Sequence, residues 1–115
     1  MNTLLAGKCG EAKAAEYLRK QRWDVIAAGY HCRFGEIDLI AVKKDMVIFV
    51  EVKLRKDSSF AAAYEAVTYA KQRRIIATAL FWMKAHNCRK QMRFDVIEIY
   101  SDTGNLNHIE NAFQA

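Results

Sequence analysis

The chain has 115 residues with 52% hydrophobic and 27% charged side chains, which is enough for one domain with a real core and excludes an intrinsically disordered protein. Lys and Arg total 18 against 13 Asp and Glu, and the net charge of +5 permits an anionic partner such as nucleic acid. Three widely spaced cysteines without a CxxC pair exclude a disulfide framework and a zinc knuckle, and no apolar run is long enough to span a membrane.

The N-terminal segment is predicted to be a helix over residues 3–22, with Thr3 as its N-cap, because helix-forming residues dominate it. It contains no long apolar stretch, so we expect no secretory signal and a cytoplasmic protein. The face that should point inward carries four residues at helical spacing: Leu4, Glu11, Ala15 and Leu18. A carboxylate is therefore predicted among the side chains that face the interior.

A short first strand is predicted over residues 23–27, and a β-hairpin follows it. The two strands of the hairpin are IDLIAV (37–42) and VIFVEVKL (47–54), and the four residues KKDM (43–46) link them. Both strands are rich in β-branched residues, as is typical of the interior of a sheet.

The second half of the chain predicts a long helix, a strand and a short final element. The helix should begin between Ser59 and Glu65 and reach about His86; the strand is MRFDVIEIY (92–100), and HIENAF forms a short strand or a turn of helix. One face of the helix carries Tyr64, Val67, Lys71, Ile75, Thr78 and Trp82. This order predicts a single α/β domain over residues 1–115, with helices packed on a mixed sheet.

The hairpin carries charges in an unusual place. If Val42 pairs with Val47, then Asp38 lies opposite Glu51, and Glu36 lies opposite Lys53. Two opposed carboxylates destabilise a sheet, and burial adds to the cost. Lys53 or Arg55 could offset this as part of a structural ion-pair cluster, and a divalent cation such as Mg²⁺ or Mn²⁺ would do so better. A register slip of one residue would instead move Asp38 to the other face.

Basic residues gather in four clusters, which suit either a solvated surface or contacts with nucleic acid. The clusters are Arg19, Lys20 and Arg22; Lys53, Arg55 and Lys56; Lys71, Arg73 and Arg74; and Arg89, Lys90 and Arg93. Pattern alone does not separate the two roles.

The spacing D38-(x)12-E51-V-K53 resembles the metal-binding signature of the PD-(D/E)xK nuclease superfamily, which has the restriction-endonuclease-like fold. Over nearly the whole chain, six blocks resemble those of the UPF0102 (YraN-like) family of small bacterial proteins. The blocks are GEAKAAEYL, RFGEIDLIA, VIFVEVKLR, EAVTYAKQRRI, RFDVIEI and HIENAF. The resemblance implies a restriction-endonuclease-like mixed β-sheet with the element order α-β-β-β-α-β.

The resemblance, which extends to archaeal Holliday-junction resolvases, also implies roles for individual residues. Asp38 and Glu51 would be the main ligands of Mg²⁺ or Mn²⁺, Glu11 would be a further ligand or would orient water, and Lys53 would be the catalytic lysine. Lys71 matches a position where related nucleases place Lys or Gln. The expected contacts with nucleic acid come from Arg33, Arg55, Lys71 and Arg74.

The sequence departs from the family pattern outside the acidic residues. Ala28 and Gly29 stand where Arg and Asn are expected, and His31 stands where an Arg is expected. A turn glycine near Gln21 is absent, and Ile37 replaces the proline of the superfamily signature. These departures concern substrate contacts more than metal chemistry.

The expected function is metal-dependent hydrolysis of phosphodiester bonds, in DNA rather than RNA; branched DNA is suggested only by the resolvases. Symmetric cleavage of two strands by so short a chain would require a homodimer. Two alternatives remain open. One is a nucleic-acid-binding module that keeps the fold without turnover, and the other is a structural or interaction protein in which Glu11, Asp38, Glu51 and Lys53 form a buried ion network.

Overall fold

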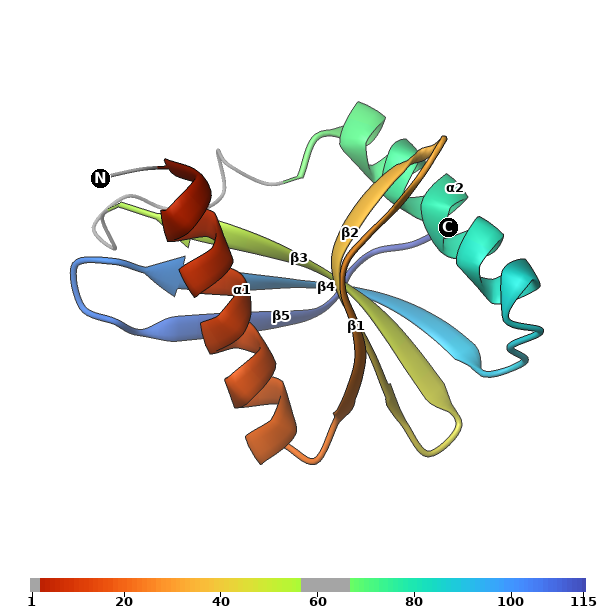
Figure 1. The fold of residues 1–115 in the computed structure, drawn as a ribbon, viewed down its shortest axis with the longest axis horizontal. Coiled ribbons are helices and arrows are strands. Elements are labelled where there is room, and N and C mark those ends of the chain that lie inside the picture. Colours follow the sequence, from red (N-terminus) through yellow and green to blue (C-terminus); the bar gives the residue numbers. More distant parts are fainter. Residues whose placement is uncertain (1–2, 57–66) are drawn as a thin grey trace.

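The computed structural model describes the backbone of residues 3–56 and 67–115, and the side chains from residue 9 onward within those ranges. Seven elements follow one another in the described ranges (Figure 1): α1 (Thr3–Lys20), β1 (Asp24–Cys32), β2 (Gly35–Lys43), β3 (Met46–Arg55), α2 (Tyr69–Ala85), β4 (Gln91–Tyr100) and β5 (Leu106–Phe113). The predicted order of helix, three strands, helix and strand is confirmed, and HIENAF belongs to a strand. The second helix begins at Tyr69, with Thr68 as its N-cap, so the expected start between Ser59 and Glu65 was wrong for this helix and Val67 precedes it. Tyr64 lies outside the described residues.

The five strands form one mixed sheet in the order β1-β2-β3-β4-β5. Neighbouring strands of this sheet run antiparallel to each other, except for β3 and β4, which run parallel. A parallel pair needs a crossover connection, and α2 lies in the segment between these two strands. Neither helix, as far as the chain is described, is long and apolar enough to cross a membrane.

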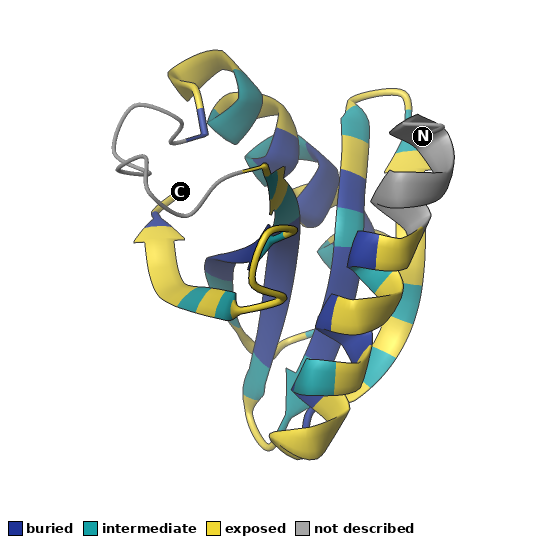
Figure 2. Cartoon of the chain, turned by 90° about the vertical axis from the view of Figure 1, so that its left-hand side faces the viewer, coloured by how far each residue is buried: buried dark blue, intermediate teal, exposed yellow. Residues whose placement is uncertain are grey.

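The two helices cover opposite faces of the sheet. The core beneath α1 contains Ala14, Ala15, Leu18, Trp23, Leu39, Ala41, Ile48, Val50, Ile97 and Ile99. The core beneath α2 contains Ile37, Ile40, Val47, Phe49, Val67, Ile75, Ala79, Trp82, Phe94, Val96 and Phe113. Figure 2 shows the buried residues along the central strands and on the side of α1 that faces them. Strands covered on both faces read as nearly continuous apolar runs, as β3 does.

The register of the β2–β3 hairpin agrees with the prediction, but its turn is shorter. Val42 pairs with Val47 as expected. Lys43 also pairs with Met46, so the link is two residues, Lys44 and Asp45, and the predicted link of four was wrong. Lys44 has a φ of 55°, in the left-handed region that two-residue hairpin turns use.

Beyond the pair of Leu39 with Val50, β2 and β3 part. The ladder between them ends there, while β3 continues beside β4 as far as Arg55. The hairpin of β1 and β2 curves over α2 instead (Figure 1). Gly29 has a φ of +68°, and it lies in β1 across from Asp38, at the point where the hairpin bends. Asn, which the family pattern leads one to expect there, also tolerates this conformation better than most residues.

The end of α1 explains how the chain does without the expected turn glycine. Arg22 has a φ of 70°, a conformation that glycine adopts most easily. The Arg22 N–H donates to the carbonyl of Arg19 and the Trp23 N–H to that of Leu18, both at 2.9 Å. These bonds close a Schellman-type cap, so α1 ends at Lys20 rather than at residue 22.

Candidate active site

Asp38 lies where β2 leaves β3, one residue past the last pair of the ladder. Its Oδ2 accepts a hydrogen bond from the Val52 N–H at 2.8 Å. The carboxylate thus takes the place of the strand partner that Val52 loses when β2 turns away, since a buried backbone N–H needs an acceptor. The local backbone therefore holds this side chain at the point of divergence.

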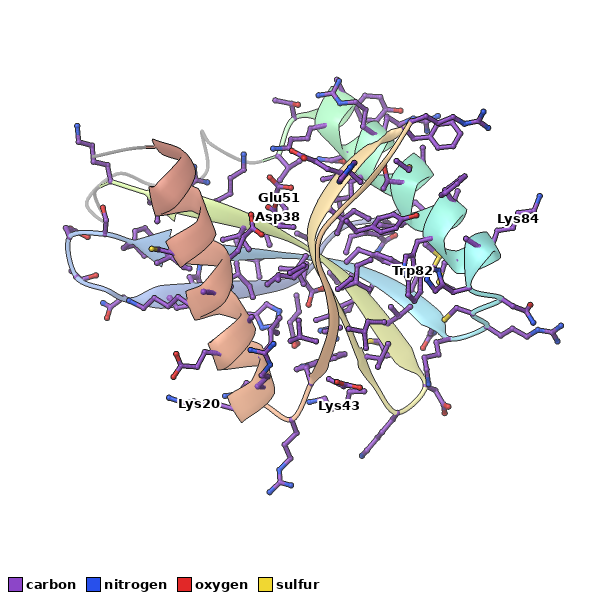
Figure 3. The ribbon with its side chains drawn as sticks, viewed as in Figure 1. Lys20, Asp38, Lys43, Glu51, Trp82 and Lys84 are labelled. Carbon is purple, nitrogen blue, oxygen red and sulfur yellow. The ribbon has the colours of Figure 1, made fainter. Side chains whose placement is uncertain are left out.

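Glu51 is the next residue of β3 after Val50, and Figure 3 shows its side chain close to that of Asp38, between the two helices. Glu51 is only 6% exposed. Its Oε1 lies 2.6 Å from the Nζ of Lys71, which belongs to the first turn of α2. Thr68 caps that turn by accepting a hydrogen bond from the Lys71 N–H at 3.2 Å. The capped helix start thereby brings an ammonium to the carboxylate.

The side chain that neutralises Glu51 is therefore Lys71, and not Lys53 or Arg55, the two that were considered from the sequence. Lys53 lies two residues along β3, half-buried, and has no ion pair within the described part of the chain. Arg55 pairs with Glu98 instead, with Nη2 at 3.0 Å from Oε2. Lys71 is remote in sequence; the resemblance pointed to its position, and the packing of α2 on the sheet brings its ammonium to Glu51.

Burial raises the pKa of Asp38 from its usual 3.8 to about 7, and the negative charge of Glu51 adds to this rise. Glu11 also raises it, while the hydrogen bond from Val52 and the charge of Lys71 lower it. Mutually repelling carboxylates with a perturbed pKa are typical of functional sites, although structural networks also produce them. The repulsion marks a position that a cation would stabilise.

Glu11 reaches the site from α1. The preceding residue, Gly10, packs on the end of β3, where an added Cβ would lie 3.8 Å from Val52 and 3.7 Å from Leu54. Glu11 is half-buried and close enough to Asp38 to affect its pKa. The structure thus gathers Glu11, Asp38 and Glu51 near one end of β3.

The donor chemistry of this site suits Mg²⁺ or Mn²⁺. These ions prefer carboxylate oxygens and are commonly held by one or two carboxylates together with water and substrate phosphate. Within the described ranges, no three or more His, Cys, Asp or Glu side chains are grouped so that they could hold a metal ion by themselves. The Asp38–Glu51 pair would therefore hold such an ion only together with water and substrate phosphate.

The other side chains predicted to contact nucleic acid lie in two places, beside α2 and at the tip of the β1–β2 hairpin. Arg74 and Lys71 line a cavity of about 560 Å³ together with Glu36 and His31. Glu36 lies opposite His31 in the β1–β2 ladder; the β2–β3 ladder ends before it, so its expected place opposite Lys53 is not realised. Arg33 lies at the tip of the β1–β2 hairpin, with its guanidinium 4.8 Å from the ring centroid of Phe34.

Sequence reasoning missed a second ionic cluster, centred on Asp95 of β4. Its carboxylate accepts two hydrogen bonds from Arg93 at 2.8 Å, and the His108 ring lies 2.7 Å from it. Tyr17 lies 3.0 Å from the other ring nitrogen of that histidine, which ties α1 to β5. The feature of the sequence that could have indicated this cluster is Asp95 itself, a charged residue within the apolar run FDVIEI. Since Asp95 is fully buried and well bonded, the cluster reads as structural.

Substituting Lys71 tests the pair that the structure reveals. Lys71→Met should lower the free energy of unfolding at pH 8 by about 1–2 kcal/mol, because it leaves a buried carboxylate without its cation. The loss is smaller than for a fully buried pair, since the Lys71 side chain is 37% exposed. Urea denaturation measures the change, and Lys71→Arg, which keeps the charge, is the control. Equal stability of the methionine variant and wild type would contradict the pairing.

A family model for "Uncharacterised protein family UPF0102" matches residues 10–99. This range contains the predicted site residues Glu11, Asp38, Glu51 and Lys53. The chain is 40% identical to a UPF0102 protein of Caldanaerobacter subterraneus subsp. tengcongensis, over 98% of both sequences. It is 39% identical to a UPF0102 protein of Myxococcus xanthus, over 95% of this chain and 89% of the relative. It is also 39% identical to one from Clostridioides difficile, over 98% of this chain and all of the relative. The chain therefore belongs to the UPF0102 family.

Proposed function

We propose that this protein is a divalent-metal-dependent nuclease that hydrolyses phosphodiester bonds in DNA. The observation that carries the proposal is the pair of half-buried Asp38 and buried Glu51 at the point where β2 and β3 part, with the pKa of Asp38 raised to about 7. The resemblance of D38…E51-V-K53 to the PD-(D/E)xK signature supports the same reading. Lys53, on the same side of β3 as Glu51, would be the lysine of this signature.

In this proposal Asp38 and Glu51 would hold Mg²⁺ or Mn²⁺, and Glu11 would add a ligand or orient water. When bound, the ion would supply an activated water and neutralise charge on the phosphate. The Lys53 ammonium would stabilise the negative charge that develops on the phosphate oxygens. Ionised Asp38 is the form that binds a cation, so metal affinity should rise as the pH passes about 7.

The basic side chains near the site would contact the DNA backbone. Lys71, Arg74 and Arg33 follow one another from the start of α2 to the tip of the β1–β2 hairpin. Contacts with phosphates position a substrate but do not read its sequence, so we expect little base specificity from them. Cutting both strands symmetrically would require a homodimer.

The proposal is tested by titrating Mg²⁺ and Mn²⁺ into wild type and into Asp38→Ala/Glu51→Ala, with cleavage of linear and branched DNA followed in parallel. We expect wild type to cleave only with metal, and the double variant to lose about 10³-fold or more in rate, as when groups that stabilise a transition state are removed. Comparing the two DNA shapes shows whether branching matters. Cleavage that survives unchanged in the double variant would come from a contaminant and would refute the assignment.

A second candidate function is a nucleic-acid-binding module without turnover. The ion pair of Lys71 with Glu51 at 2.6 Å favours it, since an internal cation already neutralises one of the two central carboxylates. Such a module would bind DNA with an affinity that falls steeply with salt, because phosphate contacts release counterions. It would not cleave DNA at any metal concentration, which separates it from the nuclease.

A further inference from the structure

Two aromatic side chains lie together on the surface beside the proposed active site. Phe34, at the tip of the β1–β2 hairpin, and Phe81, on α2, are each 39% exposed, and their ring centroids are 5.8 Å apart. The neighbouring Leu80 is 52% exposed. Together these side chains border a cavity of about 600 Å³. Exposed apolar side chains that gather in this way commonly mark a binding surface.

The edge of this cavity is basic. Its lining, taken over the described residues, contains Arg33 and Lys84 and no acidic side chain. The Arg33 guanidinium lies over the Phe34 ring at 4.8 Å, and the Phe34 and Phe81 rings are inclined at 60° to each other, so each ring offers a separate face. Aromatic rings bordered by cations form the usual platform for nucleic-acid bases, whose flat faces stack on the rings while the cations hold the phosphates.

The cavity and the proposed active site lie along the same helix, α2. Lys71, Arg74 and Phe81 fall on one side of the helix at helical spacing. Gly35 fixes the hairpin against the same helix: a Cβ there would lie 3.1 Å from the Thr78 hydroxyl and 3.4 Å from the Arg74 Cβ. Figure 1 shows the hairpin lying along α2. At 1.5 Å per residue, Phe81 lies about 15 Å along the helix from Lys71, a distance that a strand of a few nucleotides spans.

We propose that Phe34 and Phe81 stack on unpaired bases of a DNA strand whose backbone runs along Lys71 and Arg74. Paired bases within a duplex are stacked on one another and do not present their faces, so the bound strand must be single-stranded or locally unpaired at this point. The inference rests on the proposed function for its DNA substrate, and it adds that this substrate carries unpaired nucleotides near the cut. A protein partner would also fit an apolar surface, but the basic edge, without an acidic side chain among the described lining residues, favours DNA.

The test compares an oligothymidine of about a dozen nucleotides, within the length that single-strand sites cover, with an abasic strand of the same length. The two strands carry the same phosphates but differ in their bases. Binding is measured by fluorescence anisotropy in EDTA, so that no cleavage occurs. Wild type should bind oligothymidine about 10- to 100-fold more tightly than the abasic strand. Phe34→Ala/Phe81→Ala should lose this preference while its affinity for the abasic strand stays unchanged.

Two further variants guard against a trivial result. Tyr69→Ala removes another exposed aromatic side chain of α2 that does not line the cavity, and it should keep the preference for bases. Phe34→Trp keeps an aromatic ring and should retain the affinity, with its indole fluorescence quenched on addition of oligothymidine but not of the abasic strand. A Phe34→Ala/Phe81→Ala protein that does not fold would leave this quenching as the decisive measurement.

Equal affinity of wild type for the two strands would overturn the inference, as would an equal loss of affinity for both strands in the folded double variant. If the double variant instead converts a wild-type dimer into a monomer in sedimentation and keeps the preference for bases, the surface is a dimer interface and the inference is wrong. Base-dependent binding by a protein that never cleaves would refute the nuclease but leave this inference intact, so the two failures are distinguishable.

Discussion

Replacing Asp38 with Asn is expected to stabilise the metal-free protein at pH 8 while abolishing metal-dependent cleavage. Burial and the charges of Glu51 and Glu11 disfavour the ionised form of Asp38. The amide has a similar shape, and its oxygen can still accept the hydrogen bond from the Val52 N–H. A shift of the pKa from 3.8 to about 7 corresponds to at most roughly 4 kcal/mol, so we expect a gain of about 2–4 kcal/mol.

The gain should depend on pH in a defined way. Below pH 3.8 Asp38 is protonated in both the folded and the unfolded chain, so wild type and variant should have similar stability. Between 3.8 and about 7 the folded state binds more protons than the unfolded state, so the stability of wild type falls relative to the variant as the pH rises. Above about 7 the difference should be constant.

Urea denaturation from pH 4 to 8 measures this difference, and Mg²⁺ or Mn²⁺ adds a second readout. Metal should raise the unfolding temperature of wild type at pH 8, by the stabilisation that binding to the folded state provides, and should leave the variant unchanged. If Asp38 were part of a stabilising buried ion network, the same substitution would destabilise the protein. A loss of stability at pH 8 would therefore contradict the proposed site.

Removing Arg55 is expected to be strongly destabilising. Its Nε and Nη2 lie 3.1 and 3.0 Å from Glu98 Oε2, and Glu98 is only 1% exposed. The same carboxylate accepts hydrogen bonds from the Tyr100 hydroxyl at 3.1 Å and the Asn107 amide at 3.0 Å. Arg55→Ala would leave a buried charge without its cation, which typically costs about 3–5 kcal/mol.

The loss should be largest at neutral pH. Burial opposes ionisation of Glu98, but the hydrogen bonds from Asn107, Arg55 and Tyr100 together with the charge of Arg55 hold its pKa below 4.5. A carboxyl with a lowered pKa stabilises the fold above its unfolded pKa, and this stability is lost as the pH falls through the lower folded value. The difference between Arg55→Ala and wild type should therefore shrink in acid.

Arg55→Lys and Arg73→Ala are matched controls for this experiment. Lysine keeps the charge but not the two-pronged geometry, so it should lose less than alanine. Arg73 belongs to the exposed surface of α2, and its removal should change stability by less than about 0.5 kcal/mol. If Arg55→Ala weakens DNA binding without changing stability, then Arg55 contacts DNA, as the sequence suggested, and its bond to Glu98 contributes little to the fold.

Counting along the chain correctly predicted the pairs of the β2–β3 ladder up to Leu39 with Val50, whereas the predicted pair of Asp38 with Glu51 lies one residue beyond its end. Residues in paired strands follow a fixed register, so one correct pair, Val42 with Val47, determined all the others up to the end of the ladder. The periodicity of a helix likewise predicted that Ala15 and Leu18 face the core, and both are buried. Such inferences succeed because they concern neighbours within one element or one hairpin.

Contacts between distant elements could not be obtained in this way. Lys71 reaches Glu51 because α2 packs on one face of the sheet, and Arg55 turns to Glu98 because β4 lies parallel to β3. Asp95 likewise meets His108 through the pairing of β4 with β5. No local pattern encodes which of several basic side chains will reach a given carboxylate, since that depends on the angle and depth at which the elements pack.

The sequence by itself thus determined the order of the elements and the register of the hairpin, because both depend on local periodicity or on spacing along the chain, and its resemblance to known sequence blocks indicated the family. Only the tertiary structure decided that β2 leaves β3 at Asp38, and that this carboxylate then replaces a strand as partner of the Val52 N–H. The departure follows from the packing of the β1–β2 hairpin against α2. It places charged side chains at the end of an apolar ladder, where burial, together with the repulsion from Glu51 and Glu11, raises the pKa of Asp38.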